Sequence, residues 1–214
     1  MLGRNAYVVV ILCVGAWLST GCSSTTGGEK NFESFSRTRA NLATAQNDID
    51  HTLATMNGMR MTDTTNLNNA FRQYKEAVAD LERRGVETKR LADATKENMD
   101  TNVAAWQKEM DSIQDPTVKA SVESRRDAVK SNYAQLKMYA QDARKAYEVF
   151  LKQNQDMVKA LSIDLAPAAV TSLAPAMDQA TADAKMLKQK VAAAQRAMDN
   201  MANGQSPIGA GQNS

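Results

Sequence analysis

The stretch at residues 122–157 reads VESRRDAVKSNYAQLKMYAQDARKAYEVFLKQNQDM and decides the fold class. Apolar residues recur in it at strict seven-residue intervals: Val122, Val129, Leu136, Ala143, Phe150 and Met157. A seven-residue apolar repeat forms one stripe along a helix and is typical of helices that pack along a left-handed supercoiled seam. The stretch is therefore predicted to be one long amphipathic helix.

Similar spacing extends over the rest of the chain. Apolar residues lie seven apart between Phe35 and Met56, mostly three or four apart between Leu67 and Ile113, and again three or four apart between Leu173 and Met201. Residues 32–201 contain only two glycines and three prolines and show no alternating apolar pattern. Since helix is the only regular structure that fits, we predict an all-α fold.

Glycine, proline and capping residues predict where the helices begin and end. Asn57-Gly58 is a helix-stop signal, and Asn203-Gly204 is another. Asp115-Pro116 separates two helices, because proline cannot continue the first but fits the opening turn of the second with aspartate as its cap. We expect one bundle domain at 32–202, with helices at 32–57, 64–114, 116–163 and 167–202. Pro175 is expected to kink the last of these.

The predicted lengths constrain the topology. The helices at 64–114 and 116–163 are each roughly 70 to 75 Å long, and so short a turn makes them an antiparallel hairpin. The two shorter helices fold back on the hairpin to give a four-helix base, which leaves a coiled-coil-like arm at roughly 92–139. The base core is expected to contain Phe71, Tyr74, Leu81, Tyr147, Phe150 and Leu161, with Ala180, Ala184 and Ala194 allowing close helix approach.

Residues 1–21 have the pattern of an export signal. Arg4 precedes the uncharged run 6–18. Such a run gives roughly 20 Å of helix, which is short of the ~30 Å hydrocarbon core, so a cleaved signal is favoured over a permanent span. Residues 22–31 are then expected to form a flexible polar tether, and residues 203–214 a disordered tail.

The sequence Leu18-Ser19-Thr20-Gly21-Cys22 resembles the lipobox of bacterial lipoproteins, in which a palmitate-type lipid is attached to the cysteine. Leucine here lies four residues before the cysteine, whereas such boxes usually place it three before. An ordinary secretory signal cut near Ala16 or Gly21 is the alternative. Removal of residues 1–21 leaves Cys22 as the only cysteine, which excludes an internal disulfide.

Charge and ligand residues exclude several function classes. Without residues 1–21 the formal charge is near +1, and the absence of a basic block argues against nucleic acid as a partner. One histidine, His51, and one cysteine make a zinc or iron site improbable. No phosphate loop, serine elbow or metalloprotease helix is present. We therefore expect no metal, no cofactor and no enzymatic activity.

Two features of the predicted hairpin have alternative interpretations. Met99, Trp106, Met110 and Ile113 form a candidate interaction patch near the turn, because tryptophan-centred patches are frequent binding hot spots. Burial in the helix seam is the other interpretation. Gly85 occupies a core position within a helix, which indicates either close approach of a neighbour, a bend, or a weak point that the fold tolerates.

The C-terminal half also resembles a known family. The residues concerned are Tyr133 and Leu136, Phe150-Leu151, Asp156, Val158 and Leu161, Asp164-Leu165 and Pro167-Ala168. They are similar to a family of helical bacterial envelope lipoproteins that is catalogued only as a domain of unknown function, over about residues 33–202. That resemblance implies a helical envelope protein and supplies no activity.

Two functions fit these predictions. The first is a structural or adaptor lipoprotein, held by lipid on Cys22 at the periplasmic face of the outer membrane. It would bind an envelope protein or a second copy of itself through helix–helix contact. The second is a carrier or chaperone that holds an apolar molecule in a cavity lined by methionine and phenylalanine at the four-helix base. A packed base favours the adaptor, and an internal cavity favours the carrier.

Overall fold

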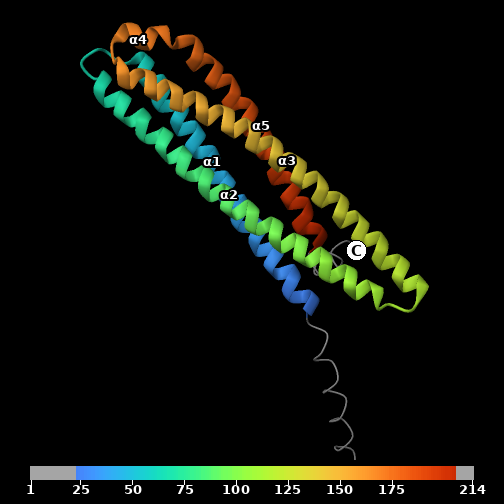
Figure 1. Ribbon diagram of the computed structural model, residues 1–214. Coiled ribbons are helices and arrows are strands. Elements are labelled where there is room, and N and C mark those ends of the chain that lie inside the picture. The colour runs from blue at the N-terminus through green and yellow to red at the C-terminus, as the bar shows by residue number, and fades with distance from the viewer. Residues whose placement is uncertain (1–22, 206–214) are drawn as a thin grey trace, which may run out of the picture.

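The computed structural model describes residues 23–205, and within this range helix is the only regular secondary structure. Five helices follow one another: α1 (Ser23–Met61), α2 (Leu67–Asp111), α3 (Pro116–Ile163), α4 (Pro167–Ser172) and α5 (Ala174–Gln205). The four long ones form an elongated up-and-down bundle (Figure 1). The predicted all-α fold, with a long α2–α3 hairpin and two flanking helices, is confirmed.

The helices form a ring in which each packs on two neighbours. Contacts are most extensive between α1 and α2 and between α3 and α5, whereas the α1–α5 and α2–α3 pairs close the ring with fewer contacts. We call the end with residues 62–66 and α4 the closed end. The opposite end, where residues 112–115 connect α2 to α3, is the arm end (Figure 1).

The flanking helices are longer than predicted, and the arm is correspondingly shorter. α1 begins at Ser23, so the tether expected at residues 22–31 is helical from that residue onward. α1 also continues past Gly58 to Met61, because the buried Met59 packs into the core beyond the expected stop. α5 continues through Gly204 to Gln205. Adding residues to a helix that already exists costs little once its nucleus has formed.

Helix ends at the α2–α3 turn follow the sequence prediction closely. Asp115 Oδ1 accepts hydrogen bonds from the backbone N–H groups of Thr117, at 2.8 Å, and Val118, at 2.9 Å, so it caps α3. Pro116 is the first helical residue, where its missing N–H costs nothing. Pro175 does not kink one long helix, as was predicted. It lies in the first turn of α5, after the helix is interrupted at Leu173.

The core contains the residues that the sequence indicated. Tyr74, Leu81 and Phe150 are completely buried, Leu161 is nearly so, and Phe71 and Tyr147 pack half-buried against them. The small side chains of α5 are also buried as predicted: Ala180, Ala184 and Ala194. Burial of this apolar area, at about 25 cal/mol per Å², supplies most of the energy that holds the bundle together.

Gly85 marks a close approach between α2 and α3. A Cβ atom placed on it would lie 2.6 Å from Cζ of Tyr147 and 2.7 Å from Cε1. The Tyr147 ring therefore packs directly on the α2 backbone, and its hydroxyl donates to the carbonyl oxygen of Leu81 at 2.6 Å. Of the interpretations of Gly85 that the sequence left open, close helix approach is the one that applies.

Candidate interaction site

Tyrosine hydroxyl groups connect α2 to α3 along the length of the hairpin. Tyr74 donates to Oδ1 of the buried Asn154 at 2.8 Å, and Tyr133 lies 3.3 Å from Oδ1 of Asp100. With Tyr147 these bonds involve positions 133, 147 and 154 of α3, which are fourteen and seven residues apart. Because the bonds reach across the gap between two helices, they fix the spacing and the register of the pair.

Burial holds these phenols in their neutral form. It raises the pKa of Tyr74 and of Tyr147 well above the usual range of a phenol. Burial and the nearby Asp100 carboxylate together raise the pKa of Tyr133 to about 12. The Asp100 carboxylate accepts a hydrogen bond from Lys96, and this bond lowers the pKa of Asp100. Each of these pKa shifts belongs to a side chain that is hydrogen-bonded within the bundle. Such shifts are expected of groups whose role is structural.

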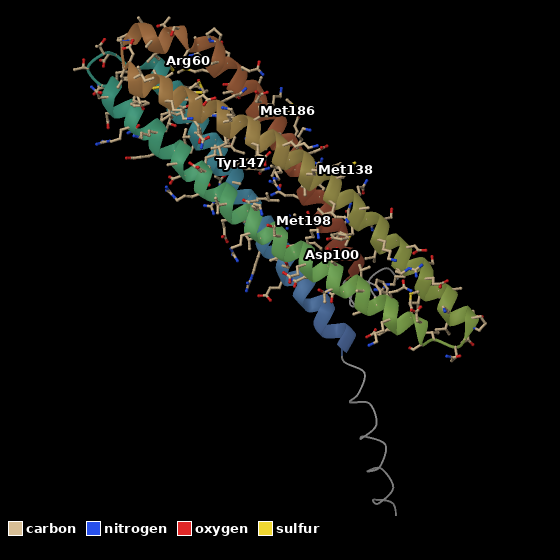
Figure 2. The ribbon with its side chains drawn as sticks, in the orientation of Figure 1. Arg60, Asp100, Met138, Tyr147, Met186 and Met198 are labelled. Atoms are coloured by element: carbon tan, nitrogen blue, oxygen red, sulfur yellow. The ribbon has the colours of Figure 1, made fainter. Side chains whose placement is uncertain are left out.

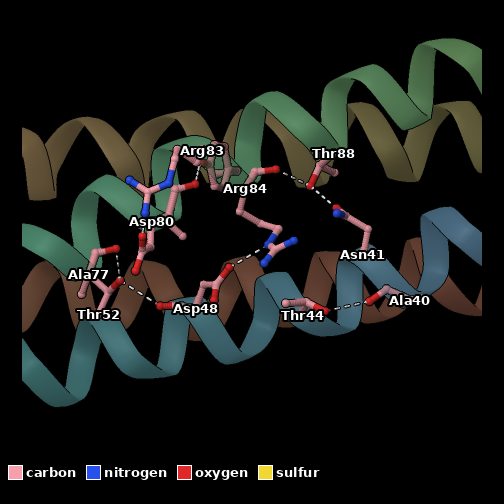
Figure 3. A network of polar contacts seen from close by, with 12 residues as sticks. Ala40, Asn41, Thr44, Asp48, Thr52, Ala77, Asp80, Arg83, Arg84 and Thr88 are labelled. Atoms are coloured by element: carbon pink, nitrogen blue, oxygen red, sulfur yellow. Dashed lines mark hydrogen bonds and ion pairs between the residues drawn. The ribbon is translucent and has the colours of Figure 1, made fainter.

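A second polar ladder joins α1 to α2 (Figure 3). Arg84 donates to Oδ2 of Asp48 at 2.8 Å, and Thr88 donates to Oδ1 of Asn41 at 2.6 Å. Further along, the buried hydroxyl groups of Thr38 and Thr95 lie 3.0 Å apart. Polar pairs at core-flanking positions of a seven-residue repeat specify which residues face each other, at some cost in stability.

The α1–α5 pair is closed by three ion pairs whose polarity alternates. Reading from the closed end, Arg60 meets Asp178 at 2.6 Å, Asp50 meets Lys188 at 2.7 Å, and Arg39 meets Asp199 at 3.1 Å. All three are solvent-accessible, so each contributes about 1 kcal/mol or less. If α5 slid along α1 by the spacing between two neighbouring ion pairs, like charges would lie opposite each other. The alternation of charge therefore disfavours that register.

The candidate patch at the arm end is not an exposed surface. Met99 and Met110 are only 1% exposed, so neither is accessible to a partner while the bundle stays closed. Trp106 and Ile113 are half-buried, and Trp106 packs against the core. Burial in the helix seam, the other interpretation of these residues, therefore applies to Met99 and Met110.

Three of the exposed large apolar side chains among the described residues lie on the paired helices α3 and α5. Met138 and Val149 of α3 and Met186 of α5 are each about half exposed, at 52%, 53% and 48%. Met138 and Met186 extend from the same side of the bundle (Figure 2). We call the surface formed by Met138, Val149 and Met186 the α3–α5 surface.

The pairing of α3 with α5 places Val149 and Met186 near each other. Gln153 donates to Asp183 at 2.7 Å on one side of them, and Asp142 and Lys190 lie 4.0 Å apart on the other. The sequence contains a signal for this surface. Met138 and Val149 lie eleven residues apart, which is three helical turns, and both fall outside the buried seven-residue series.

The hollows of the bundle are shallow and lie on its outside. The two best formed among the described residues have volumes of about 200 and 190 Å³. One lies beside the α3–α5 surface, between Tyr139, Asp142 and Lys190. The other lies between α1 and α2 near Arg37 and Arg90. Neither enters the four-helix core.

Residues 23–205 contain neither a metal-binding cluster nor a membrane-spanning helix. No cluster of three or more His, Cys, Asp or Glu side chains with metal-binding geometry is found there, and His51 is solvent-exposed. None of the described helices has a stretch both long and apolar enough to cross a bilayer. The export signal expected at 1–21 and the expected lipid-attachment residue Cys22 lie outside the described residues, as does 206–214 of the expected tail.

Comparison with known proteins identifies a family and no activity. A family model named DUF2959, whose description is "protein of unknown function", matches residues 31–203. These residues include nearly all of the helical bundle. No curated protein and no solved structure matches the chain. The family model covers well over half of the sequence, and the chain therefore belongs to the DUF2959 family of proteins of unknown function.

Proposed function

We propose that this protein is a lipid-anchored adaptor of the bacterial envelope, which binds another envelope protein through the α3–α5 surface. The observation that carries the proposal is the combination of an exposed apolar surface with a four-helix base in which the two best-formed hollows of the described residues have no part. Met56, Phe150 and Met177 are completely buried at this base, and none of them lines either hollow. A carrier would need the opposite arrangement.

The chemistry of the α3–α5 surface suits a helical partner. Apolar side chains from two adjacent helices offer contacts to the apolar face of an amphipathic helix. Met138 and Met186 adapt to irregular partners, because methionine is unbranched and flexible. Asp142 and Lys190 at the centre supply one charge of each sign, which favours a partner with a complementary pair.

The anchor rests on the sequence around Cys22. The apolar run at 6–18 and the lipobox-like residues that follow support export and lipid attachment at this cysteine. Cys22 directly precedes α1, so the bundle would sit close to the bilayer.

Photo-crosslinking in intact cells tests the adaptor. A photoreactive residue placed at Val149 or Met186 is expected to capture one heterologous envelope protein, identified by mass spectrometry. The matched control is Val86 of α2, which is 69% exposed on another face of the bundle. Equal capture from Val86, or capture of this chain alone from every position, would refute a heterologous partner at the α3–α5 surface.

The anchor has its own test. Intact-mass analysis of membrane-extracted protein should show an acylated chain that begins at Cys22, and Cys22→Ser should release the protein from the membrane fraction. A soluble chain with a free thiol at Cys22 would refute lipid attachment.

A further inference from the structure

The arm end brings together parts of the chain that are far apart in sequence. The first residue of α1, Ser23, lies at this end, as do the α2–α3 turn at residues 112–115 and the last residues of α5 (Figure 1). The proposed anchor at Cys22 immediately precedes Ser23. The turn and the anchor are therefore at the same end of the bundle, and the closed end is at the other.

Helix lengths determine how far the turn extends. α1 and α2 share the connection at the closed end, and they contain 39 and 45 residues respectively. At 1.5 Å per residue, α2 extends about 9 Å further toward the arm end than α1 does. The α2–α3 turn is thus the outermost described part of the bundle at this end, beyond the first residue of α1.

We propose that the α2–α3 turn contacts the lipid bilayer that carries the anchor, so that the bundle stands on the membrane at two points. This inference rests on the proposed lipid at Cys22. Because α1 is helical from Ser23, no irregular spacer separates the lipid from the bundle. A bundle held upright at Ser23 therefore brings the longer hairpin onto the headgroups before α1 itself reaches them. The closed end points away from the membrane and presents the upper part of the α3–α5 surface to the periplasm.

The side chains at the turn suit a headgroup layer. Val118 is 52% exposed, Pro116 is exposed, and Ile113 is half-buried, so the turn offers small apolar side chains to the interface. Lys108 and Lys119 lie on either side of the turn, with the carboxylates of Glu109, Asp111 and Asp115 between them, and the flexible lysine stems allow the ammonium groups to reach lipid phosphates. Asp115 is already engaged with two backbone N–H groups, which lowers its demand for water.

Spin labels at the two ends of the bundle test this arrangement. The full-length chain is expressed in a bacterium that processes lipoproteins, extracted from membranes and reconstituted in vesicles of phosphatidylethanolamine and phosphatidylglycerol. One variant carries Val118→Cys and another Met61→Cys; once residues 1–21 are removed and Cys22 is acylated, the introduced cysteine is the one thiol available for the label. Met61 is the matched control, because it is 88% exposed at the closed end. Collision rates of each label with oxygen and with a water-soluble nickel complex then report its depth in the bilayer.

The expected result is a Val118 label that is shielded from nickel at least threefold relative to the Met61 label, which behaves as in water. Two aqueous labels on a chain whose mass includes the lipid would overturn the membrane contact while leaving the anchor intact. Equal shielding at both ends would overturn it as well, because the bundle would then lie flat. A chain without lipid at Cys22 refutes the proposed anchor, and with it the basis of this inference.

Discussion

Replacing Gly85 by alanine tests the close approach of α2 and α3. In the interior of a helix this change normally stabilises a protein by about 1 kcal/mol, because alanine has the higher helix propensity. Here the new Cβ would lie 2.6 Å from Cζ of Tyr147, well inside van der Waals contact. The ring must move, and its 2.6 Å hydrogen bond to the Leu81 carbonyl oxygen weakens when it does.

The magnitude follows from three opposing contributions. Overpacking costs about 1 to 3 kcal/mol, and loss of the hydrogen bond costs about 1 kcal/mol. The gain in helix propensity returns about 1 kcal/mol. We expect Gly85→Ala to lower the free energy of unfolding by about 1 to 3 kcal/mol. For a chain of this size that corresponds to a fall in Tm of roughly 2 to 12 °C.

Urea unfolding followed by circular dichroism at 222 nm measures the change, and two controls define its cause. Gly58→Ala adds a methyl group that meets nothing within 4 Å, so it should stabilise by up to about 1 kcal/mol. In a Tyr147→Ala background, Gly85→Ala should also become stabilising, because the obstructing ring is gone. If Gly85→Ala alone stabilises the protein as Gly58→Ala does, the proposed packing of Tyr147 on α2 is wrong.

Three further predictions concern polar groups. Tyr74→Phe leaves Oδ1 of the buried Asn154 without its donor and should destabilise the protein by about 1 to 3 kcal/mol in urea unfolding. The folded pKa of Tyr133 is raised to about 12, so the contribution of its neutral phenol to the free energy of unfolding is complete below pH 10. That contribution is lost as the pH rises from 10 to 12. The free energy of unfolding should fall by up to about 1.4 kcal/mol per pH unit for this tyrosine, and less steeply in Tyr133→Phe. Asp115→Ala removes the cap of α3 and should lower the free energy of unfolding by about 1 kcal/mol in the same assay. Asp111→Ala is the control, because it removes a nearby aspartate and leaves the cap in place.

The fold could be predicted because apolar spacing and helix length leave few alternatives. The seven-residue series from Val122 to Met157 requires a helix, and Asp115-Pro116 allows only a tight turn between two long helices. Antiparallel packing and a four-helix base then follow from length alone. The helix ends were predicted less well, because Gly58 and Gly204 remain helical where no left-handed conformation is required of them.

The site was predicted less well than the fold, and for a physical reason. A single helix pattern shows which residues face inward, but it does not show how far a neighbouring helix extends. Met99 and Met110 are buried in the bundle, whereas the pattern alone left open whether they face the helix seam or a partner. Gly85 was likewise ambiguous until Tyr147 could be placed opposite it, 62 positions further along the chain.

Polar residues in this bundle determine which helices pair and in what register, whereas apolar residues supply the energy. Apolar seven-residue stripes alone would allow α5 to slide along α3 or α1, because one Leu or Ala resembles the next. The alternating ion pairs of α1 with α5, such as Asp50 with Lys188, make each such slide unfavourable. The tyrosine bonds do the same for α2 and α3, since a shifted phenol such as that of Tyr74 would be buried without a partner. A rod with so strictly defined a register keeps its outer side chains at fixed positions, and an adaptor that binds through Val149 and Met186 requires that property.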